Sequence, residues 1–334
     1  MRMVVVEYER SPEVSKDCCH LGLALGDEDE EDDIPKLIEE ENKKHQVQLD
    51  AAWINELVPL AYMLHPYSIL TCIGTSTISV DHLFVMASVL CALRGRTIQT
   101  SVAISTATYI SPYYIVLLPP LALLLRRKQE GAFSSYFSFV GACCAVMGAL
   151  MYTSYAIMGS WDFVNAVYYF TFTVPDLSPN VGLFWYFFIE IFDQFRNFFL
   201  FLFQYHMLVY PIPLAMRVSH RPLFLFAFSL GYIAIFKSYP SIGDAAFYMP
   251  LLIIFHRQLI EMRNLFILVQ ILLFVTVLSP IFWHLWIVTG AGNSNFYYGL
   301  TLAYSAAQVL IISESMLAVL KQDKKQRLLS KKRD

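Results

Sequence analysis

The residues most suggestive of chemistry are two acidic side chains within an aromatic stretch. Glu190 and Asp193 follow the run FWYFF and stand three residues apart. On one helix this spacing places both carboxylates on the same face. Ionisable side chains at membrane depth are costly and usually face a cavity or a partner. We expect either contact with a polar headgroup or partner, or a structural ion pair in which Arg196 neutralises Asp193. The aromatic candidates around them are Phe184, Trp185, Tyr186, Phe187, Phe188 and Phe192.

Two further predicted loops carry polar candidates. Lys237 and Asp244 bracket a turn rich in Pro and Gly, and they can pair across it. A lysine beside a lipid interface can instead hold an anionic headgroup. In the loop that reads GAGNSN, Asn295 or Ser294 can cap the following helix. Asn293 and Asn295 are also candidates for contact with a lipid or a partner.

These residues must be positioned by a membrane domain. Apolar residues make up 57% of the chain and charged residues 15%, against about 25% charged in a soluble domain. This excludes a disordered or fibrous protein and predicts an all-α polytopic membrane helix bundle. A span needs about 20 mostly apolar residues. Clear spans are expected at 133–159, 182–216, 265–290 and 295–320, and shorter or interrupted ones at 57–74, 78–93, 98–125, 222–238 and 244–256.

Lys and Arg predict the orientation of these spans, because basic loops stay in the cytosol. Basic residues cluster near 94–96, 126–128, 217–221, 257–263 and 321–333, whereas the loops at 160–181 and 290–294 contain none. Both ends of 98–125 are basic, so we expect a re-entrant hairpin or two tilted helices broken at Ser111-Pro112. About eight crossings result, with both termini cytosolic. Broken helices in a membrane indicate a cavity.

The chain divides into an acidic N-terminal extension and a basic remainder. Residues 1–56 hold 16 acidic and 6 basic side chains, while 57–334 hold 11 acidic and 18 basic. We expect an acidic, disordered cytosolic extension at 1–52, a membrane domain at 53–320 and a basic cytosolic tail at 321–334. The first twenty residues contain no recognisable signal peptide. The tail ends KKRD, in which Lys331 and Lys332 match a dilysine retrieval signal of the endoplasmic reticulum.

Other kinds of site have little support. The cysteines form no CxxC or Cys/His pattern, so we predict no metal site and no cofactor. The basic residues stand at segment ends, which does not indicate nucleic-acid binding. His284, in the run WHLW, is expected in an interfacial aromatic belt. Residues 163–174 are expected to form an amphipathic segment on the lumenal face.

Three long segments resemble a known family. They read SWDFVNAVYYFTFTVPDLSPNVGLFWYFFIEIF at 160–192, IAIFKSYPSIGDAAFYM at 233–249 and FWHLWIVTGAGNSNFYY at 282–298. They are similar to the class U subunit of the glycosylphosphatidylinositol (GPI) transamidase complex, in collinear order over about 53–320. LHPYSILTCIGTST at 64–77 resembles an earlier family motif, with His65 where the family usually has Asn.

The resemblance implies a non-catalytic, multi-pass subunit of the endoplasmic reticulum membrane. Its partners would be the other transamidase subunits, the GPI lipid and the attachment signal of the precursor protein, and its fold would resemble the GPI mannosyltransferases. The Cys/His protease chemistry of the complex would belong to another subunit. Family members usually begin with a membrane anchor and a lumenal loop, and we expect the acidic extension to stand in their place here.

Two other functions remain open at this stage. A mannosyltransferase that uses a dolichol-linked sugar needs a carboxylate base beside a lumenal sugar site, and Asp162 or Asp176 are the candidates. A transporter would line its pathway with Glu190 and Asp193. No inverted repeat of the kind common in transporters is visible in the sequence.

Overall fold

The computed structural model describes residues 1, 3, 53–128, 133–260 and 262–331. Within these ranges every regular element is a helix and no strand occurs, which confirms the predicted all-α class. The acidic extension before residue 53 and Lys332 lie outside the described residues, apart from Met1 and Met3. Lys331 is the last residue of the final helix.

The elements follow one another with few residues between them. In chain order they are a helix over 53–64, α4 (Pro66–Ile73), α5 (Ile78–Leu93), α6 (Thr97–Ile110), η1 (Pro112–Leu117), α7 (Leu118–Lys128), α8 (Phe133–Met158), α9 (Asp162–Val164), η2 (Asn165–Tyr169), α10 (Phe170–Thr173), α11 (Phe184–Glu190), α12 (Asp193–Val209), α13 (Pro211–Arg217), α14 (Pro222–Phe236), α15 (Ile242–Leu252), η3 (Ile253–Phe255), α16 (His256–Leu259), α17 (Leu265–Trp283), η4 (His284–Val288) and α18 (Ser294–Lys331).

Four helical stretches among the described residues are long and apolar enough to cross a membrane. They are Tyr136–Met158, Asp193–Arg217, Leu265–Val288 and Ser294–Lys325. All four coincide with predicted spans, and the chain is a multi-pass membrane protein. The prediction of one uninterrupted span over 182–216 is wrong, because α11 ends at Glu190 and α12 begins at Asp193.

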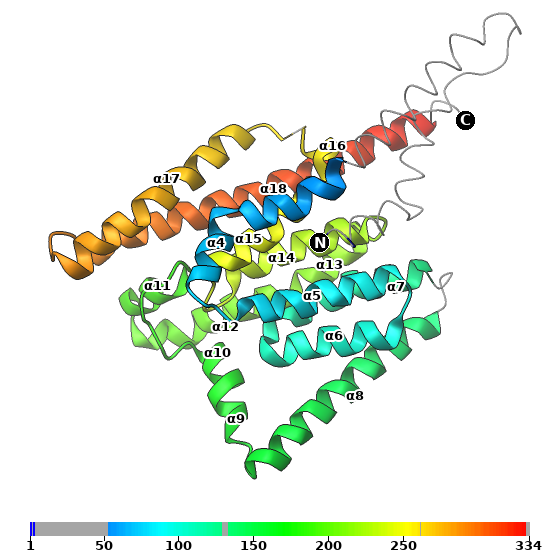
Figure 1. The fold of residues 1–334 in the computed structure, drawn as a ribbon, viewed down its shortest axis with the longest axis horizontal. Coiled ribbons are helices and arrows are strands. Elements are labelled where there is room, and N and C mark those ends of the chain that lie inside the picture. The colour runs from blue at the N-terminus through cyan, green and yellow to red at the C-terminus, as the bar shows by residue number, and fades with distance from the viewer. Residues whose placement is uncertain (2, 4–52, 129–132, 261, 332–334) are drawn as a thin grey trace, which may run out of the picture.

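The expected hairpin between two basic ends is present. Ser111 is extended, and Pro112, which has no backbone N–H, opens the short helix η1. The chain then returns beside itself, since a β-carbon built on Gly95 would lie 3.4 Å from the β-carbon of Lys128. In Figure 1, α6 and α7 both reach the same end of the bundle. The stretch therefore starts and finishes on one side.

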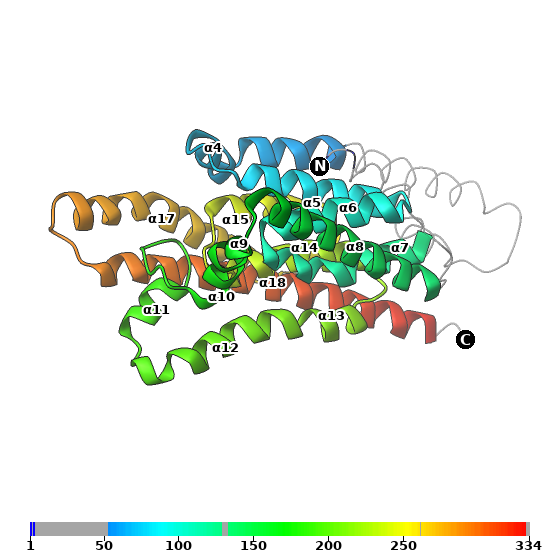
Figure 2. The same cartoon turned by 90° about the horizontal axis from the view of Figure 1, so that it is seen from below.

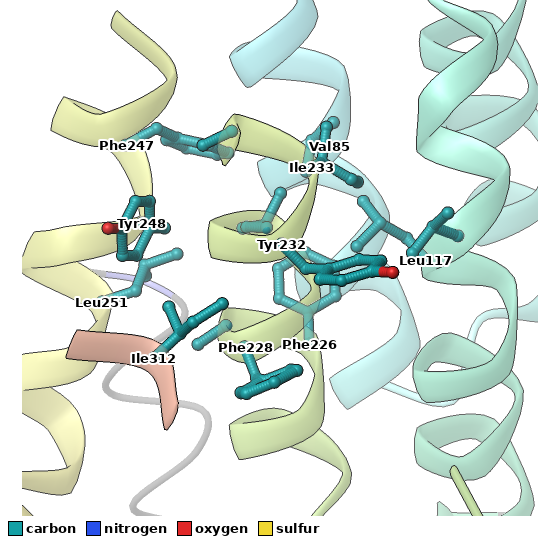
Figure 3. Close-up of a cluster of buried hydrophobic side chains, with 14 of the residues drawn as sticks. Val85, Leu117, Phe226, Phe228, Tyr232, Ile233, Phe247, Tyr248, Leu251 and Ile312 are labelled. Carbon is teal, nitrogen blue, oxygen red and sulfur yellow. The ribbon is translucent and has the colours of Figure 1, made fainter. Parts of the chain in front are cut away.

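Helix α14 is the centre of the core. It is buried along almost its whole length, and Figure 3 shows its side chains between those of α5, η1, α15 and α18. The packing is closest at Gly231, where an added β-carbon would lie 2.7 Å from Ile312 Cγ2 and 3.1 Å from Tyr248 Cδ2. Both distances are shorter than an ordinary van der Waals contact. Helices α14, α15 and α18 can therefore pack this closely only because residue 231 has no side chain.

The two ends of the bundle differ in chemistry. At the basic end, Arg221 Nε lies 2.9 Å and His220 Nε2 lies 2.6 Å from the Asp323 carboxylate, and Arg127 donates to the His220 carbonyl oxygen. These contacts join α7, the turn before α14 and α18. The opposite end, here called the loop end, carries the connections at 159–161, 174–183, 237–241 and 289–293. Figures 1 and 2 show α18 running between the two ends.

Candidate functional site

Aromatic side chains from two segments that are far apart in the chain, α11 and the stretch from the end of α17 to the start of α18, meet at the loop end. Trp185 of α11 is 1% exposed. Its ring lies 6.2 Å from that of Trp286 in η4 and 6.2 Å from that of Tyr297 in α18. Tyr186 lies 4.5 Å from Tyr298, measured between ring centroids. We call this set, completed by Trp283, the aromatic cluster: Trp185, Tyr186, Trp283, Trp286, Tyr297 and Tyr298.

The other face of α11 packs against α12. Phe184, Phe187 and Phe188 lie 5.2–6.2 Å from the ring of Phe203. Aromatic pairs at such distances add to the hydrophobic stabilisation. Helix α11 is therefore held on one side by α12 and on the other by α18.

Arg196 does not neutralise Asp193, contrary to one of the two alternatives raised by the sequence. Its Nη2 donates to the carbonyl oxygens of Val174 at 2.7 Å and Thr173 at 3.3 Å, and its guanidinium lies 5.2 Å from the ring centroid of Phe188. Among the described residues no ion pair joins Arg196 to Asp193. Val174 adopts a left-handed conformation with φ +49°, which is strained for a β-branched residue. Arg196 therefore fixes a strained turn.

Glu190 and Asp193 do not share a helix face. Ile191 and Phe192 are extended and separate α11 from α12. Both carboxylates are exposed. Glu190 interacts with the hydroxyl of Tyr186, so it belongs to the edge of the aromatic cluster. Asp193 is the first residue of α12, where the helix dipole favours a negative charge. Phe192, between them, is 71% exposed.

The loop at 174–183 interlocks with the loop at 237–241. A β-carbon on Gly182 would lie 2.6 Å from Pro240 Cγ, so only glycine permits this approach to a rigid ring. The hydroxyl of Tyr239 donates to the Asp176 carbonyl oxygen at 3.0 Å. The hydroxyl of Tyr298 donates to the Leu183 carbonyl oxygen at 3.4 Å. The two loops are thus tied to each other, and the loop at 174–183 is also tied to α18.

Lys237 and Asp244 form the predicted ion pair. Lys237 Nζ lies 2.7 Å from Asp244 Oδ1 and 2.6 Å from Oδ2. The two residues are only 8% and 6% exposed. Asp244 Oδ2 also accepts from the backbone N–H of Ser241 at 2.8 Å and completes a capping box on α15. The Lys237 ammonium is therefore engaged inside the bundle, which speaks against its alternative use as a headgroup contact.

The predicted cap of α18 is one residue off. Asn293, and neither Ser294 nor Asn295, caps the helix, because its Oδ1 accepts from the Phe296 N–H at 3.2 Å. Asn295 Oδ1 instead accepts from the hydroxyl of Tyr186. Both Asn side chains are exposed. The loop end thus presents amide, phenol and carboxylate groups beside indole rings.

Comparison with known proteins shows the family of the chain. The family model of the GPI transamidase subunit PIG-U matches residues 26–304. The chain belongs to this family. It is 37% identical over 283 residues to the human GPI-anchor transamidase component PIGU. The matched region covers 82% of this chain and 65% of that relative. The chain is 36% identical over 265 residues to the GPI transamidase component GAB1 of Saccharomyces cerevisiae, covering 78% and 66%. The chain spans about two thirds of the length of these relatives.

Sequence reasoning missed one polar network of this PIG-U family member. The hydroxyl groups of Tyr113 and Ser238 are 2.7 Å apart, and Gln204 Nε2 donates to Ser238 Oγ at 2.7 Å. Gln204 Nε2 also donates to the Phe172 carbonyl oxygen at 3.4 Å. The network ties η1, α10, α12 and the end of α14 together. In the sequence these residues are only polar side chains within apolar stretches. That pattern does not reveal that Gln204 pairs with Ser238, 34 residues away, or Tyr113 with Ser238, 125 residues away.

The loop end presents groups that suit the binding of polar ligands. Indole and phenol rings with an adjacent amide and carboxylate suit polyols, amines and the interfacial part of a lipid. No group of three or more His, Cys, Asp or Glu suited to a metal occurs among the described residues. Hydrogen bonds from the Ser178 hydroxyl and N–H lower the pKa of the Asp176 carboxyl, which makes it a weaker base.

Proposed function

We propose that this PIG-U family member is a non-catalytic membrane subunit of GPI transamidase. In this proposal its loop end contacts the GPI lipid or the attachment signal of the precursor protein. The observation that carries it is the meeting of the three family-like segments at one place: the aromatic cluster joins 160–192 to 282–298, and Gly182 packs against Pro240 of 233–249. Relatives from human and yeast carry names of transamidase components.

The exposed edge of the aromatic cluster is the proposed contact. Tyr186, Glu190 and Asn295 lie together there, and Phe192 and Asn293 are exposed beside them. A carboxylate next to aromatic rings attracts ammonium groups, and amide and hydroxyl groups bond to sugar hydroxyls. A glycolipid offers both in its headgroup, which is why we favour the GPI lipid over a purely apolar signal peptide.

The proposal includes orientation and location. The basic end faces the cytosol by the positive-inside rule, and the loop end faces the lumen of the endoplasmic reticulum. About eight crossings, a cytosolic acidic extension at 1–52 and a basic tail at 321–334 complete this arrangement. The other subunits of the complex are the proposed protein partners.

The alternatives receive less support from the geometry. Asp162 and Asp176 are exposed, and each accepts a hydrogen bond from a serine two residues away, as in a local turn. This is a sufficient structural reason for both carboxylates, so a mannosyltransferase base is not needed to explain them. Glu190 and Asp193 are exposed on either side of a helix break, whereas a transporter pathway would enclose them.

Replacement of Glu190 tests the proposal in cells that lack the native subunit. Glu190→Leu and Glu190→Gln should both insert normally, because Glu190 is exposed at the end of α11 and neither change adds a charge to the membrane. Surface levels of GPI-anchored proteins should fall with both variants. Asp162→Asn is the matched control: it removes an exposed loop-end carboxylate and should leave surface levels unchanged. Normal surface levels with both Glu190 variants at equal expression would contradict the proposed contact, and a loss with Asp162→Asn would favour the mannosyltransferase.

A further inference from the structure

One acidic side chain lies within the apolar stretch of α18 and has no partner in the part of the chain that the structure describes. Glu314 belongs to the stretch Ser294–Lys325, which is long and apolar enough to cross a membrane. It is the only Asp, Glu, Lys or Arg of α18 before Lys321. Its carboxylate makes no hydrogen bond and no ion pair with any described residue. Ionisable groups at membrane depth are costly, and they usually pair with one another.

Glu314 is poorly placed to reach Lys321 or the water at the basic end. Lys321 is the next basic residue along α18, two turns or about 10 Å further toward that end. Side chains meet on a helix surface when they stand three or four residues apart, and this separation is larger. The Cα–Cβ bonds of a helix tilt toward its N-terminus. The Glu314 side chain is therefore directed away from the basic end.

The face of α18 beside Glu314 is open. Leu310 and Leu317 stand one turn before and one turn after Glu314, and they are 47% and 49% exposed. Helices α14, α16 and α17 pack against α18, but they leave uncovered a row of exposed residues at helical spacing. We call this row, with the partly exposed Glu314 at its edge, the outward stripe: Leu302, Ala306, Leu310, Glu314, Leu317 and Lys321.

The chemistry of the outward stripe selects its occupant. Lipid tails can cover the leucines, but they offer nothing to a carboxylate. Protonation does not remove the need for a partner, because the neutral acid carries a hydroxyl that must donate. A Lys or Arg side chain supplies both donors and the opposite charge, and its apolar stem can lie along the leucines. Polar contacts of this kind link transmembrane helices to one another.

We propose that the outward stripe binds a transmembrane helix of another membrane protein, in which a Lys or Arg side chain pairs with Glu314. The partner helix packs on Leu310 and Leu317, and its basic group donates to the carboxylate between them. The stripe is separate from the exposed edge of the aromatic cluster. The proposal therefore holds whether or not that edge binds a lipid.

Photo-cross-linking of the full chain in cells tests the contact. A photoreactive phenylalanine in place of Leu317 should form an adduct with a transmembrane segment that contains Lys or Arg. The control is the same probe in place of Ile98, which is 74% exposed on α6. It should not form this adduct, because α6 lies apart from α18 in both views of the fold (Figures 1 and 2). Adding Glu314→Leu should reduce the adduct at residue 317 by at least about fivefold.

An exchange of charges separates an ion pair from a purely apolar contact. Glu314→Lys should abolish the adduct at residue 317, and a partner whose Lys or Arg is replaced by Glu should restore it. No protein adduct at residue 317, an adduct with a second copy of this chain, an adduct with a segment that has no basic residue, or a failed exchange would each overturn the proposal.

Thermal unfolding of the isolated chain in mild detergent excludes a role for Glu314 within its own chain. Glu314→Leu should melt at the same temperature as the wild type or above it, because it removes a charge that has no partner there. A lower melting temperature would show that Glu314 is paired within the chain, and it would overturn the proposal.

Discussion

Replacing Asp244 by Asn tests how the loop end is held together. Asn keeps the size of the side chain and an oxygen that accepts from the Ser241 N–H, so the cap of α15 is retained. It removes the charge that faces Lys237 at 2.6 and 2.7 Å. Because both residues are buried, the Lys237 ammonium is left without its partner in a medium that solvates it poorly.

The expected loss follows from burial and from the neighbouring charge. Removing one partner of a buried ion pair costs about 3–5 kcal/mol of unfolding free energy. Asp81 lies within electrostatic range of Lys237 and keeps part of the attraction, so we expect the lower end, about 3 kcal/mol. At roughly 2–4 °C per kcal/mol, the melting temperature falls by about 6–12 °C.

The assay is thermal unfolding of the full chain in mild detergent, followed by fluorescence-detected size exclusion. Asp244→Asn should melt well below the wild type, and the double variant Lys237→Met, Asp244→Asn should recover part of the loss, because it leaves no unpaired ammonium although it removes the charge that attracts Asp81. Asp176→Asn, in an exposed turn, is the control and should change little. Equal melting of Asp244→Asn and the wild type, or a double variant no better than the single one, would refute the reasoning.

Three further predictions concern packing, orientation and location. Gly231→Val should lower the unfolding free energy by about 1–3 kcal/mol through collision with Ile312, whereas unchanged unfolding would mean that α14 and α18 separate freely. A tag inserted within 165–180 should resist cytosolic protease and a C-terminal tag should be digested; the reverse pattern would invert the orientation. Lys331→Ser with Lys332→Ser, expressed without partners, should leak to the Golgi, and unchanged reticular staining would exclude KKRD as the retrieval signal.

Much of the helix layout could be predicted because the signals are local. Helix α5 has the predicted bounds, since GTST and RGR flank an apolar run of one helix length. The hairpin of α6 and α7 followed from basic residues at both ends and from Pro112. The Lys237–Asp244 pair followed from a short turn between two charges.

The break at Ile191 and Phe192 could not be predicted, because neither Pro nor Gly marks it. It arises from tertiary contacts, in which Trp185 packs toward α18 and Arg196 binds the carbonyl oxygen of Val174. The choice of Asn293 as the cap of α18 has a similar origin. The stretch NSN offers several capping residues, and Tyr186, 109 residues away in the chain, engages Asn295.

The most direct test of the proposed function is the set of proteins that accompany the chain in the membrane. The tagged full chain would be isolated from cells in mild detergent, and its companions would be identified by mass spectrometry. A subunit of GPI transamidase should bring down the other subunits of that complex in stoichiometric amounts, and a Gly182→Ala variant, which collides with Pro240 at the loop end, should bring down less. Isolation of the chain without any transamidase subunit, at an expression level matched to the native subunit, would contradict the account.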